Sequence, residues 1–366
     1  MLKQVKIRNY KNFRDEIILS LDTPNNYEFN RKIIKNNIIN KTLIVGKNAS
    51  GKTNLGYAIM DITTHLTDKT RKAVRPYTNL YNVDSIAHFE YVFCFNNSIL
   101  RYMYEKEVQD IPCREELYID DKLVLLNDVN NKMVDLSGAE NLNYQLYNEK
   151  EISLVKYVSS NTILNENEKE CRVFIDFIKF VNAMLWFSST EGHRYIGLVN
   201  ETGDLLEKIL EKDGTPEKLQ KFLADLGIYY NLISRDNGDG KTIYCRMGNK
   251  EVQLYSLISS GTRSLIFFYL WYLQNEKVSF VYIDEFDAFY HTDLAKAIVK
   301  ILIDLVDIQT IITTHNTDLI SNEILRPDCI FELCDNKIKP FSNLTHKALR
   351  EAHNLQKMYK AGAFNE

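Results

Sequence analysis

Short runs of apolar and β-branched residues occur at three widely separated places in this chain of 366 residues, at positions 42–45, 280–283 and 310–314. Uninterrupted runs of this length are typical of strands that are buried on both faces of a parallel sheet. The first run is followed by a glycine, the second by an aspartate and the third by a histidine. Because parallel strands present their carboxyl ends at one edge, the pattern predicts an α/β fold whose functional residues gather there.

Other segments alternate between apolar and polar positions. Residues 89–95 and 99–105 do so clearly, which predicts the last two strands of an antiparallel meander. Residues 228–233 and 242–246 are interpreted as the two strands of a hairpin, because the stretch Asn-Gly-Asp-Gly at 237–240 between them has turn chemistry.

Helical spacing of apolar residues marks the middle of the chain, at 174–187 and again at 205–210. A further helix is delimited by Thr215 as N-cap, Pro216 at its first position and Gly227 after its end. No heptad register persists, which argues against a long coiled coil.

These elements divide the chain into three parts. We expect an N-terminal lobe at 1–105, a mainly helical insertion at 106–228 and a C-terminal lobe at 229–366. The aromatic stripes of the insertion are interpreted as core residues. The insertion is also where we expect a partner to bind, because the functional residues of the three apolar runs lie in the two lobes that flank it.

The segment after the first apolar run matches G-x-x-x-x-G-K-[S/T], the pattern of a P-loop between a strand and a helix. Gly46 and Gly51 let the backbone curl so that its N–H groups face phosphate, Lys52 supplies a positive charge and Thr53 a hydroxyl for Mg²⁺. The expected ATP contacts are Gly46, Lys47, Asn48, Ala49, Ser50, Gly51, Lys52, Thr53 and Asn54.

The second run ends in Asp284 and Glu285. Beside a P-loop, Asp284 is expected to hold Mg²⁺ through water and Glu285 to polarise the attacking water. The third run delivers His315 to the same edge, where it is interpreted as a sensor of the γ-phosphate. We therefore assign the catalytic roles to Glu285, His315 and Lys52, and metal binding to Thr53 and Asp284.

Ser259 and Gly261 directly precede an apolar helix that begins near residue 265. On its own this segment is an ordinary N-cap. Its position upstream of Asp284 and Glu285 favours a second phosphate-binding helix N-terminus.

Taken together, the motifs resemble those of ABC-type ATPase heads, in particular the branch with SMC proteins, RecF, the OLD nucleases and the RloA/AbiL-like ATPases of phage defence. Residues 5–13 and 17–21 look like the opening strands of those heads. Residues 284–291 are similar to the D-E-F-D-x-x-x-H wording of the defence ATPases, and residues 349–364 look like the ending of that group.

This resemblance implies an ABC-type P-loop NTPase head, in which a mixed sheet combines antiparallel N-terminal strands with a parallel core. It also implies a homodimer that forms through an ATP sandwich. Each γ-phosphate would lie between the P-loop of one chain and Ser259 and Gly261 of the other. Lys11 stands where this family often presents a basic residue to the nucleotide; the alternative is a plain surface lysine.

The chain departs from the family pattern in two places. The signature reads I-S-S-G-T where transporters have L-S-G-G-Q. In addition, no glutamine occurs between Thr53 and Gln109, where a Q-loop would supply a magnesium ligand. Glu90 or His88 is a candidate replacement, although either could equally be a surface residue of its strand. We therefore expect slow hydrolysis.

Composition narrows the partners. A net charge of -4 and a pI near 6.1 give no global attraction to DNA, although local patches remain compatible with DNA binding. The six cysteines lack paired C-x-x-C spacing, which argues against a zinc site. Their scattered positions are typical of a protein in the reducing cytosol. No apolar run is long enough to cross a bilayer and no signal peptide is evident, so we expect a cytoplasmic protein without membrane contact.

About fifty residues follow His315, which is too few for the Toprim nuclease of an OLD protein. We therefore expect any toxic activity to reside on a separate effector, a nuclease or toxin. The sequence predicts an ATPase that acts as a dimerising switch, the sensor or scaffold of a bacterial anti-phage or toxin-like system. The alternative is a RecF-like, ATP-dependent DNA clamp for recombination or repair; a transporter subunit is disfavoured by the departures above.

Overall fold

The computed structural model describes most of the chain, and the structural statements below refer to that part. The described residues are 1–22, 24–69, 75–108, 111–148, 152–190, 194–196, 215–236 and 241–364. The apolar spacing at 205–210 and the turn expected at 237–240 lie outside them.

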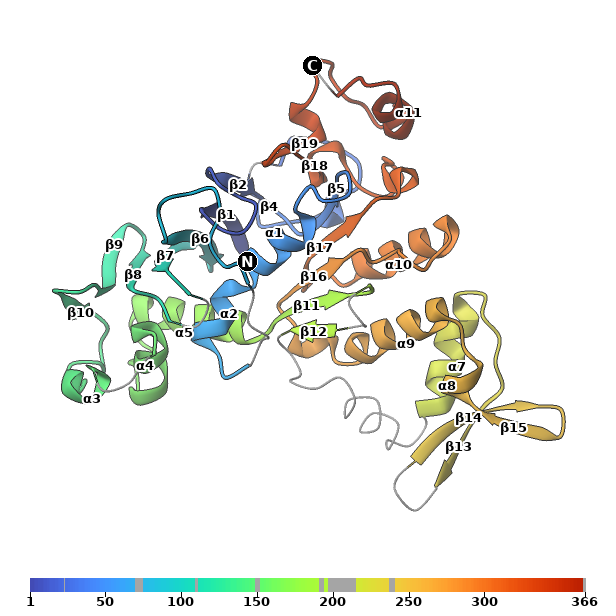
Figure 1. Ribbon diagram of the computed structural model, residues 1–366, viewed down its shortest axis with the longest axis horizontal. Coiled ribbons are helices and arrows are strands. Elements are labelled where there is room, and N and C mark those ends of the chain that lie inside the picture. Colours follow the sequence, from blue (N-terminus) through green and yellow to red (C-terminus); the bar gives the residue numbers. More distant parts are fainter. Residues whose placement is uncertain are drawn as a thin grey trace.

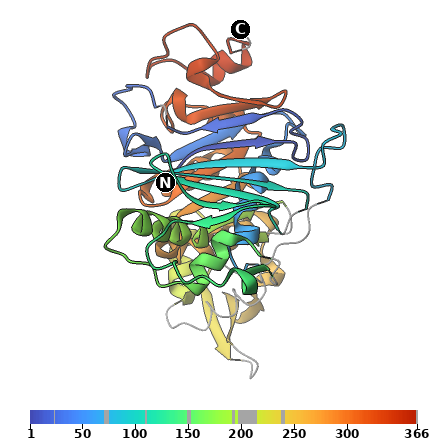
Figure 2. The same cartoon turned by 90° about the vertical axis from the view of Figure 1, so that its left-hand side faces the viewer.

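One layer of the molecule is a seven-stranded antiparallel sheet. In spatial order its strands are β10 (Lys132–Val134), β9 (Lys122–Asn127), β8 (Arg114–Ile119), β7 (Ser98–Lys106), β6 (Ala87–Phe95), β1 (Leu2–Arg8) and β2 (Ile17–Ser20). In β6 and β7 alternate residues are buried, so one face packs on the core and the other meets solvent. Figure 1 shows β6 to β10 at the left, and Figure 2 views the molecule from that side.

The second layer is a seven-stranded mixed sheet. Its strands are β12 (Arg194–Ile196), β11 (Met184–Ser188), β16 (Phe280–Asp284), β17 (Gln309–Thr314), β5 (Lys41–Val45), β18 (Ile330–Cys334) and β19 (Lys337–Pro340). The five central strands are parallel, and the two edge strands pair antiparallel. Every residue of β5, β16 and β17 is buried, which explains the continuous apolar runs of the sequence.

Helices pack on and between these layers. Their bounds are α1 (Lys52–Ile59), α2 (Asp61–Leu66), α3 (Tyr144–Asn148), α4 (Leu154–Asn161), α5 (Lys169–Asn182), α7 (Thr215–Asp225), α8 (Leu254–Leu257), α9 (Ser260–Tyr272), α10 (Thr292–Asp304) and α11 (Leu355–Lys360). Two small sheets complete the fold, from β3 (Ile34–Lys35) and β4 (Ile38–Ile39), and from β13 (Leu232–Asp236), β14 (Lys241–Met247) and β15 (Lys250–Gln253). The last three strands project at the lower right of Figure 1.

The helix expected before Gly227 is α7. Gly227 adopts a φ of 80° beyond its end, a backbone conformation that glycine reaches without steric cost. The Ile228 N–H then donates to the Leu223 carbonyl oxygen at 2.8 Å, which closes the helix as the sequence predicts.

The segment 106–228 contains more strand than the sequence predicts. The helical spacing read at 174–187 ends with α5, and residues Met184–Ser188 form β11 inside the core sheet. Periodicity alone cannot separate a short buried strand from a buried helical segment, and β11 becomes a strand because β16 pairs with it in parallel. The same segment supplies β8, β9 and β10, which continue the antiparallel sheet without interruption.

A buried polar network lies where α2 meets the antiparallel sheet. Lys106 Nζ is 2.8 Å from Asp61 Oδ2, and neither side chain is accessible to solvent. The hydroxyl of Tyr104 also donates to Asp61 Oδ2, at 3.0 Å, and Lys106 Nζ donates to Thr64 Oγ1 at 2.9 Å. Further hydrogen bonds thus surround the buried ion pair, although Asp61 Oδ1 makes no hydrogen bond within the described part of the chain.

A second buried carboxylate of the antiparallel sheet belongs to Glu115 on β8. Its carboxylate accepts a hydrogen bond from the Tyr102 hydroxyl at 2.6 Å and another from the Leu154 backbone N–H at 2.7 Å. The second bond fixes the first turn of α4 to the sheet, and Ser153, the N-cap of α4, also donates to Glu115.

Among the described residues, none of the helices combines the length and the apolar character that crossing a bilayer needs.

Candidate nucleotide-binding site

The P-loop connects β5 to α1 in a tight curl. A Cβ atom at Gly46 would lie 2.6 Å from the Leu333 carbonyl oxygen, so only glycine fits there. Gly51 has a φ of 103°, and α1 begins directly after it, at Lys52. The Ser50 hydroxyl is buried and makes no hydrogen bond within the described part of the chain. The close backbone packing at Gly46 and the unsatisfied hydroxyl of Ser50 are both compatible with a loop that binds phosphate.

Lys52 reaches back across this loop. Its Nζ donates to the carbonyl oxygens of Gly46 at 2.9 Å and of Lys47 at 3.2 Å. It also lies 3.0 Å from His315 Nε2. Burial lowers the pKa of Lys52, while the nearby carboxylates of Glu285 and Asp284 act in the opposite direction. The first and third apolar runs thus meet at this lysine, as the sequence predicts.

Asp284, at the end of β16, faces the hydroxyl of Thr53. Thr53 Oγ1 donates to Asp284 Oδ2 at 2.6 Å, and Thr313 Oγ1 donates to Oδ1 at 2.8 Å. Burial raises the pKa of Asp284, and the two threonine hydroxyls oppose that shift. A buried carboxylate beside a hydroxyl, without a cation in direct contact, is the donor set that Mg²⁺ prefers.

Glu285 follows in a left-handed conformation with a φ of 47°. Its backbone N–H donates to Thr313 Oγ1 at 2.8 Å, and its Oε1 lies 3.4 Å from His315 Nε2. A non-glycine residue held in this region stores strain, which persists where the surroundings fix the chain. Thr313 therefore orients both acidic residues. It belongs to the apolar run 310–314, but nothing in the local sequence indicates this role.

Asp287 is a second carboxylate that the sequence analysis left without a role. It accepts a hydrogen bond from Thr314 Oγ1 at 2.8 Å, and burial raises its pKa. The bond ties the turn after β16 to the end of β17, next to His315.

Tyrosine hydroxyls hold the P-loop helix at both ends. Tyr282 of β16 donates to the Lys52 carbonyl oxygen at 2.6 Å and accepts from the Gly56 N–H. Tyr91 of β6 donates to the Ala58 carbonyl oxygen at 2.6 Å and accepts from a backbone N–H of α2. Each hydroxyl therefore lies between a backbone carbonyl oxygen and the N–H group four residues later. These contacts fix α1 and the turn into α2 to both sheets.

Ser259 and Gly261 lie at the start of α9, as predicted. Ser259 is the N-cap, and its hydroxyl accepts from the Thr262 N–H at 3.2 Å. A Cβ atom at Gly261 would lie 2.9 Å from the Phe289 carbonyl oxygen, so the turn after β16 packs closely on this helix. Within the described part of the chain, no hydrogen bond or ion pair joins either residue to its own P-loop.

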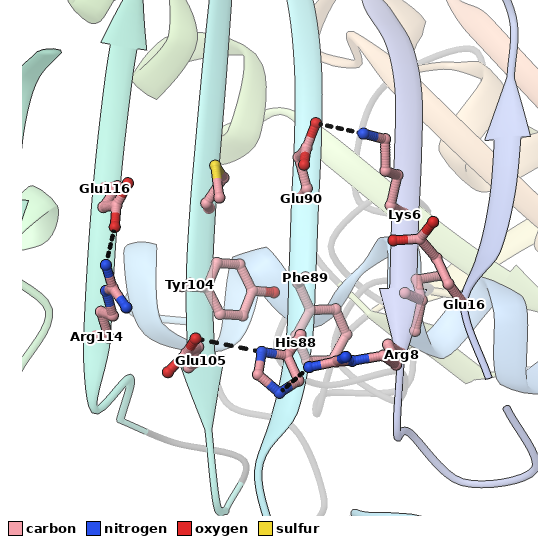
Figure 3. Close-up of a pocket in the computed structure, with 12 residues that line it drawn as sticks. Lys6, Arg8, Glu16, His88, Phe89, Glu90, Tyr104, Glu105, Arg114 and Glu116 are labelled. Carbon is pink, nitrogen blue, oxygen red and sulfur yellow. Dashed lines mark hydrogen bonds and ion pairs between the residues drawn. The ribbon is translucent and has the colours of Figure 1, made fainter. Parts of the chain in front are cut away.

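His88 and Glu90, the candidate replacements for the missing glutamine, lie on the outer face of the antiparallel sheet (Figure 3). Glu90 pairs with Lys6 at 3.0 Å, and His88 Nδ1 lies 3.2 Å from Glu105 Oε1. Their neighbour Tyr91 points the other way and contacts α1. Because adjacent strand residues face opposite sides of a sheet, neither candidate is directed at Asp284, and the alternative that both are surface residues of their strand holds.

Lys11 lies in the turn between β1 and β2 with a φ of 49°. Its Nζ is 5.9 Å from the ring centre of Tyr57 on α1. The next residue, Asn12, contacts the P-loop helix directly, since its Oδ1 accepts from Asn54 Nδ2 at 2.6 Å. Asn54 is therefore engaged with the turn after β1, and Asn12 was missed because asparagine in a turn carries no specific signal.

The fold and the site together define a P-loop NTPase, with the P-loop strand inside the parallel core and an antiparallel N-terminal sheet beside it. Residues 41–321 match the family described as "AAA domain, putative AbiEii toxin, Type IV TA system", and the chain belongs to that family. No curated protein matches the chain. The narrower similarity to RloA/AbiL-like ATPases stays a prediction.

Several solved structures are similar to the chain. The SMC head domain from Thermotoga maritima is 15% identical with a TM-score of 0.44, covering 92% of this chain and 97% of that chain. The Smc head domain with an extended coiled coil bound to the C-terminal domain of ScpA, from Pyrococcus furiosus, is 13% identical with a TM-score of 0.44, covering 92% and 95%. An SmcHead bound to the C-winged helix domain of ScpA is 13% identical with a TM-score of 0.43, covering 92% and 96%.

Proposed function

We propose that this protein binds and slowly hydrolyses ATP, and that ATP binding closes a homodimer that acts as a switch in a toxin-like or anti-phage system. The observation that carries the proposal is the convergence of Lys52, Asp284, Glu285 and His315 at one sheet edge. They come from three strand ends and lie within hydrogen-bonding distance of one another or of shared threonines.

The side chains at this edge suit distinct roles in phosphoryl transfer. Lys52 would bind phosphate oxygens with a charge that its loop carbonyls do not neutralise. Thr53 and Asp284 would hold Mg²⁺, which when bound supplies charge neutralisation at the phosphates. Glu285, beside His315, would accept the proton of the attacking water, and the histidine would keep the carboxylate oriented toward the γ-phosphate.

Dimerisation is supported by the position of the second phosphate-binding motif. Ser259 caps the N-terminus of α9 and Gly261 lies in its first turn, and within the described residues neither makes a polar contact with its own P-loop. A helix N-terminus with accessible N–H groups attracts anions. The γ-phosphate bound to a second copy would satisfy these groups, and its loss on hydrolysis would remove the bridge between subunits.

The biological context comes from the family description, which names a putative toxin of a type IV toxin–antitoxin system. Such a setting involves at least two proteins. We therefore propose a separate effector or antitoxin polypeptide as the partner that responds to the ATP-bound dimer.

The test is the native mass of Glu285→Gln, expressed with its flanking genes and measured by light scattering in ATP and Mg²⁺. We expect a dimer that carries an additional protein subunit, because the variant retains ATP and cannot release it by hydrolysis. Lys52→Ala, which should not bind ATP, is the matched control and is expected to stay monomeric.

Three results would count against parts of the proposal. A Glu285→Gln protein that stays monomeric in saturating ATP would exclude the sandwich dimer. A dimer without a partner, whose DNA affinity rises with ATP and falls steeply with salt, would replace the effector model with a DNA clamp. Loss of ATP binding in Ser259→Arg, which is expected to remain a nucleotide-binding monomer, would exclude the role of Ser259 across the interface.

A further inference from the structure

A cavity of about 380 Å³ lies between the C-terminal segment and the stretch of chain that follows His315, and it has no role in the assignments above. Its walls come from one residue of α10, from residues 318–323 and from residues 351–356, where α11 begins. Figure 1 shows α11 near the top of the molecule, at the opposite end from β13, β14 and β15.

Carboxylates outnumber ammonium groups in the lining of this cavity. Asp318, Glu323 and Glu351 line it, with Lys296 of α10 as the one lysine among the lining residues. Asp318 pairs with Lys360 at 3.3 Å. Glu323 and Glu351 are exposed, and neither carboxylate forms an ion pair with a residue that the structure describes. These two carboxylates are therefore available to accept hydrogen bonds from a ligand.

Asn322 is a further lining residue with an unused acceptor. Its side chain is 6% exposed, and its Nδ2 donates to the carbonyl oxygens of Arg350 at 2.9 Å and of Glu351 and His353 at 3.1 Å. Its Oδ1 is buried and makes no hydrogen bond within the described part of the chain. The three bonds fix the two walls of the cavity to each other, so its shape does not depend on a ligand. The unsatisfied oxygen indicates that a hydrogen-bond donor is missing there.

A short stretch of chain connects this cavity to the edge of the mixed sheet. His315 follows β17, and the next residue, Asn316, donates through Nδ2 to Thr292 Oγ1 at 3.3 Å. Asn316 Oδ1 accepts from the Asp318 N–H at 2.9 Å, at the start of the 3₁₀ turn Thr317–Leu319. A ligand in the cavity would therefore contact the segment that begins at the proposed γ-phosphate sensor.

We propose that this cavity is a docking site for an arginine side chain of the partner polypeptide. The identity of that partner rests on the proposed function. A guanidinium has five N–H donors and no acceptor, which matches a cavity whose free groups are two carboxylates and the amide oxygen of Asn322. The opposite charges of the cavity and the guanidinium also favour this occupant over an acidic one.

A metal ion fits this cavity less well. In the part of the chain that the structure describes, no group of three or more His, Cys, Asp or Glu side chains is placed to hold one. The planar fork of arginine can instead bridge acceptors on both walls, Glu323 on one and Glu351 on the other. The docking site would lie in the C-terminal lobe, whereas the sequence predicts a partner at 106–228.

The first test titrates the full chain with N-acetyl-arginine methylamide and follows it by NMR of ¹³C-labelled isoleucine and alanine methyl groups. Ile320 and Ala352 line the cavity and report on its occupancy. We expect saturable shifts of both signals, with a dissociation constant of about 1–10 mM for so small a ligand. N-acetyl-citrulline methylamide has nearly the same shape without the charge and should leave both signals in place.

Glu323→Gln and Glu351→Gln should each weaken binding of the arginine derivative by about twofold to fivefold, the range of an exposed ion pair, and the double variant by about tenfold. Glu276→Gln removes an exposed carboxylate outside the cavity and is the matched control. Since all three side chains are exposed, none of these substitutions should impair folding.

The second test places the same double substitution in Glu285→Gln, expressed with its flanking genes and held in ATP and Mg²⁺. Light scattering should show the dimer without its additional subunit. The corresponding protein with Glu276→Gln should keep that subunit.

The outcomes separate the two proposals. Unchanged methyl signals with the arginine derivative, equal shifts with the citrulline derivative, or a partner that stays bound to the double variant would overturn the docking site and leave the proposed function intact. Displacement of the arginine derivative by Ca²⁺ would assign the cavity to a metal ion, and loss of the dimer itself would assign it to a second copy of this chain. A Glu285→Gln protein without an additional subunit overturns the proposed function, and with it the occupant named here.

Discussion

Asp61 and Asp284 are both shielded from solvent, with exposed fractions of 0% and 1%, yet their surroundings differ completely. Asp61 pairs with the Lys106 ammonium at 2.8 Å inside the antiparallel sheet. Asp284 faces two threonine hydroxyls at the edge of the mixed sheet, at 2.6 and 2.8 Å. The first carboxylate has its countercharge built into the fold, whereas the second lacks one in direct contact.

The same contrast holds for the lysine and the histidine of each region. Lys106 is enclosed with its acidic partner, and burial lowers the pKa of the neighbouring His65 well below its usual value. Lys52 donates to carbonyl oxygens and lies beside His315, whose side chain is 36% exposed. A closed network stabilises a structure, while an edge with uncompensated charges is suited to binding a charged ligand.

The largest effect is expected when the closed network is broken. Lys106→Met should lower the free energy of unfolding by about 3–5 kcal/mol, because it leaves the Asp61 carboxylate buried without a countercharge. Urea denaturation measures this loss. The double variant Asp61→Leu and Lys106→Met should recover most of it, since an apolar pair has no charge to desolvate; a double variant as unstable as the single one would contradict the ion-pair explanation.

Next in size is a pair of matched substitutions with opposite signs. Asp61→Asn should lower the free energy of unfolding by about 3 kcal/mol, because it leaves the Lys106 ammonium unpaired. Asp284→Asn should raise it at neutral pH, because it removes a buried carboxylate that, among the described residues, no cation contacts directly. The same substitution should abolish Mg²⁺-dependent nucleotide binding.

The pH dependence of Asp284 provides a check on that sign. Its pKa in the folded protein lies above the reference value of 3.8, so between those two values the native state binds more protons than the unfolded chain. By linkage, the free energy of unfolding falls as the pH rises through this window. Denaturation curves from pH 4 upward should show this fall in the wild type and lack the Asp284 contribution in Asp284→Asn.

A smaller effect is expected from the two tyrosines that hold the P-loop helix. Tyr282→Phe and Tyr91→Phe each remove one buried hydroxyl from the helical ladder and should cost about 1 kcal/mol of stability. Only Tyr282→Phe should also weaken ATP binding, because Tyr282 contacts the backbone of Lys52 itself. Equal ATP affinities for the two variants, measured by titration, would show that the contact at Lys52 does not position the loop.

The smallest effect on stability is expected from Lys52→Ala. Lys52 donates to carbonyl oxygens of its own loop and contacts a histidine, so its loss should change the free energy of unfolding by about 1 kcal/mol or less. Nucleotide binding should nevertheless be lost. A large destabilisation would mean that the edge is a structural network like the one around Asp61.

Sequence reasoning was most reliable where the information is local. The P-loop joins a strand and a helix within eight consecutive residues, and its glycines are required by close backbone approach and a positive φ. The buried strands β5, β16 and β17 were recognised because full burial demands uninterrupted apolar side chains. The carboxyl ends of these strands had to meet, which brought Lys52, Asp284 and His315 together as expected.

Tertiary structure decided everything that depends on partners distant in the chain. Met184–Ser188 became a strand because β16, about a hundred residues later, pairs with it. The Glu90 side chain faces away from the site, because its neighbour Tyr91 faces the other side of the sheet and donates a hydrogen bond to α1. The local sequence around Asp61 and Lys106 does not predict that they pair. An acidic residue on a helix and a lysine at a strand end would each be expected to face solvent. The sequence by itself determined the P-loop and the fully buried strands, because their conformation follows from local chemistry. Only packing determined the conformation of ambiguous segments such as 184–188, which charges are neutralised, and which are left to bind a ligand.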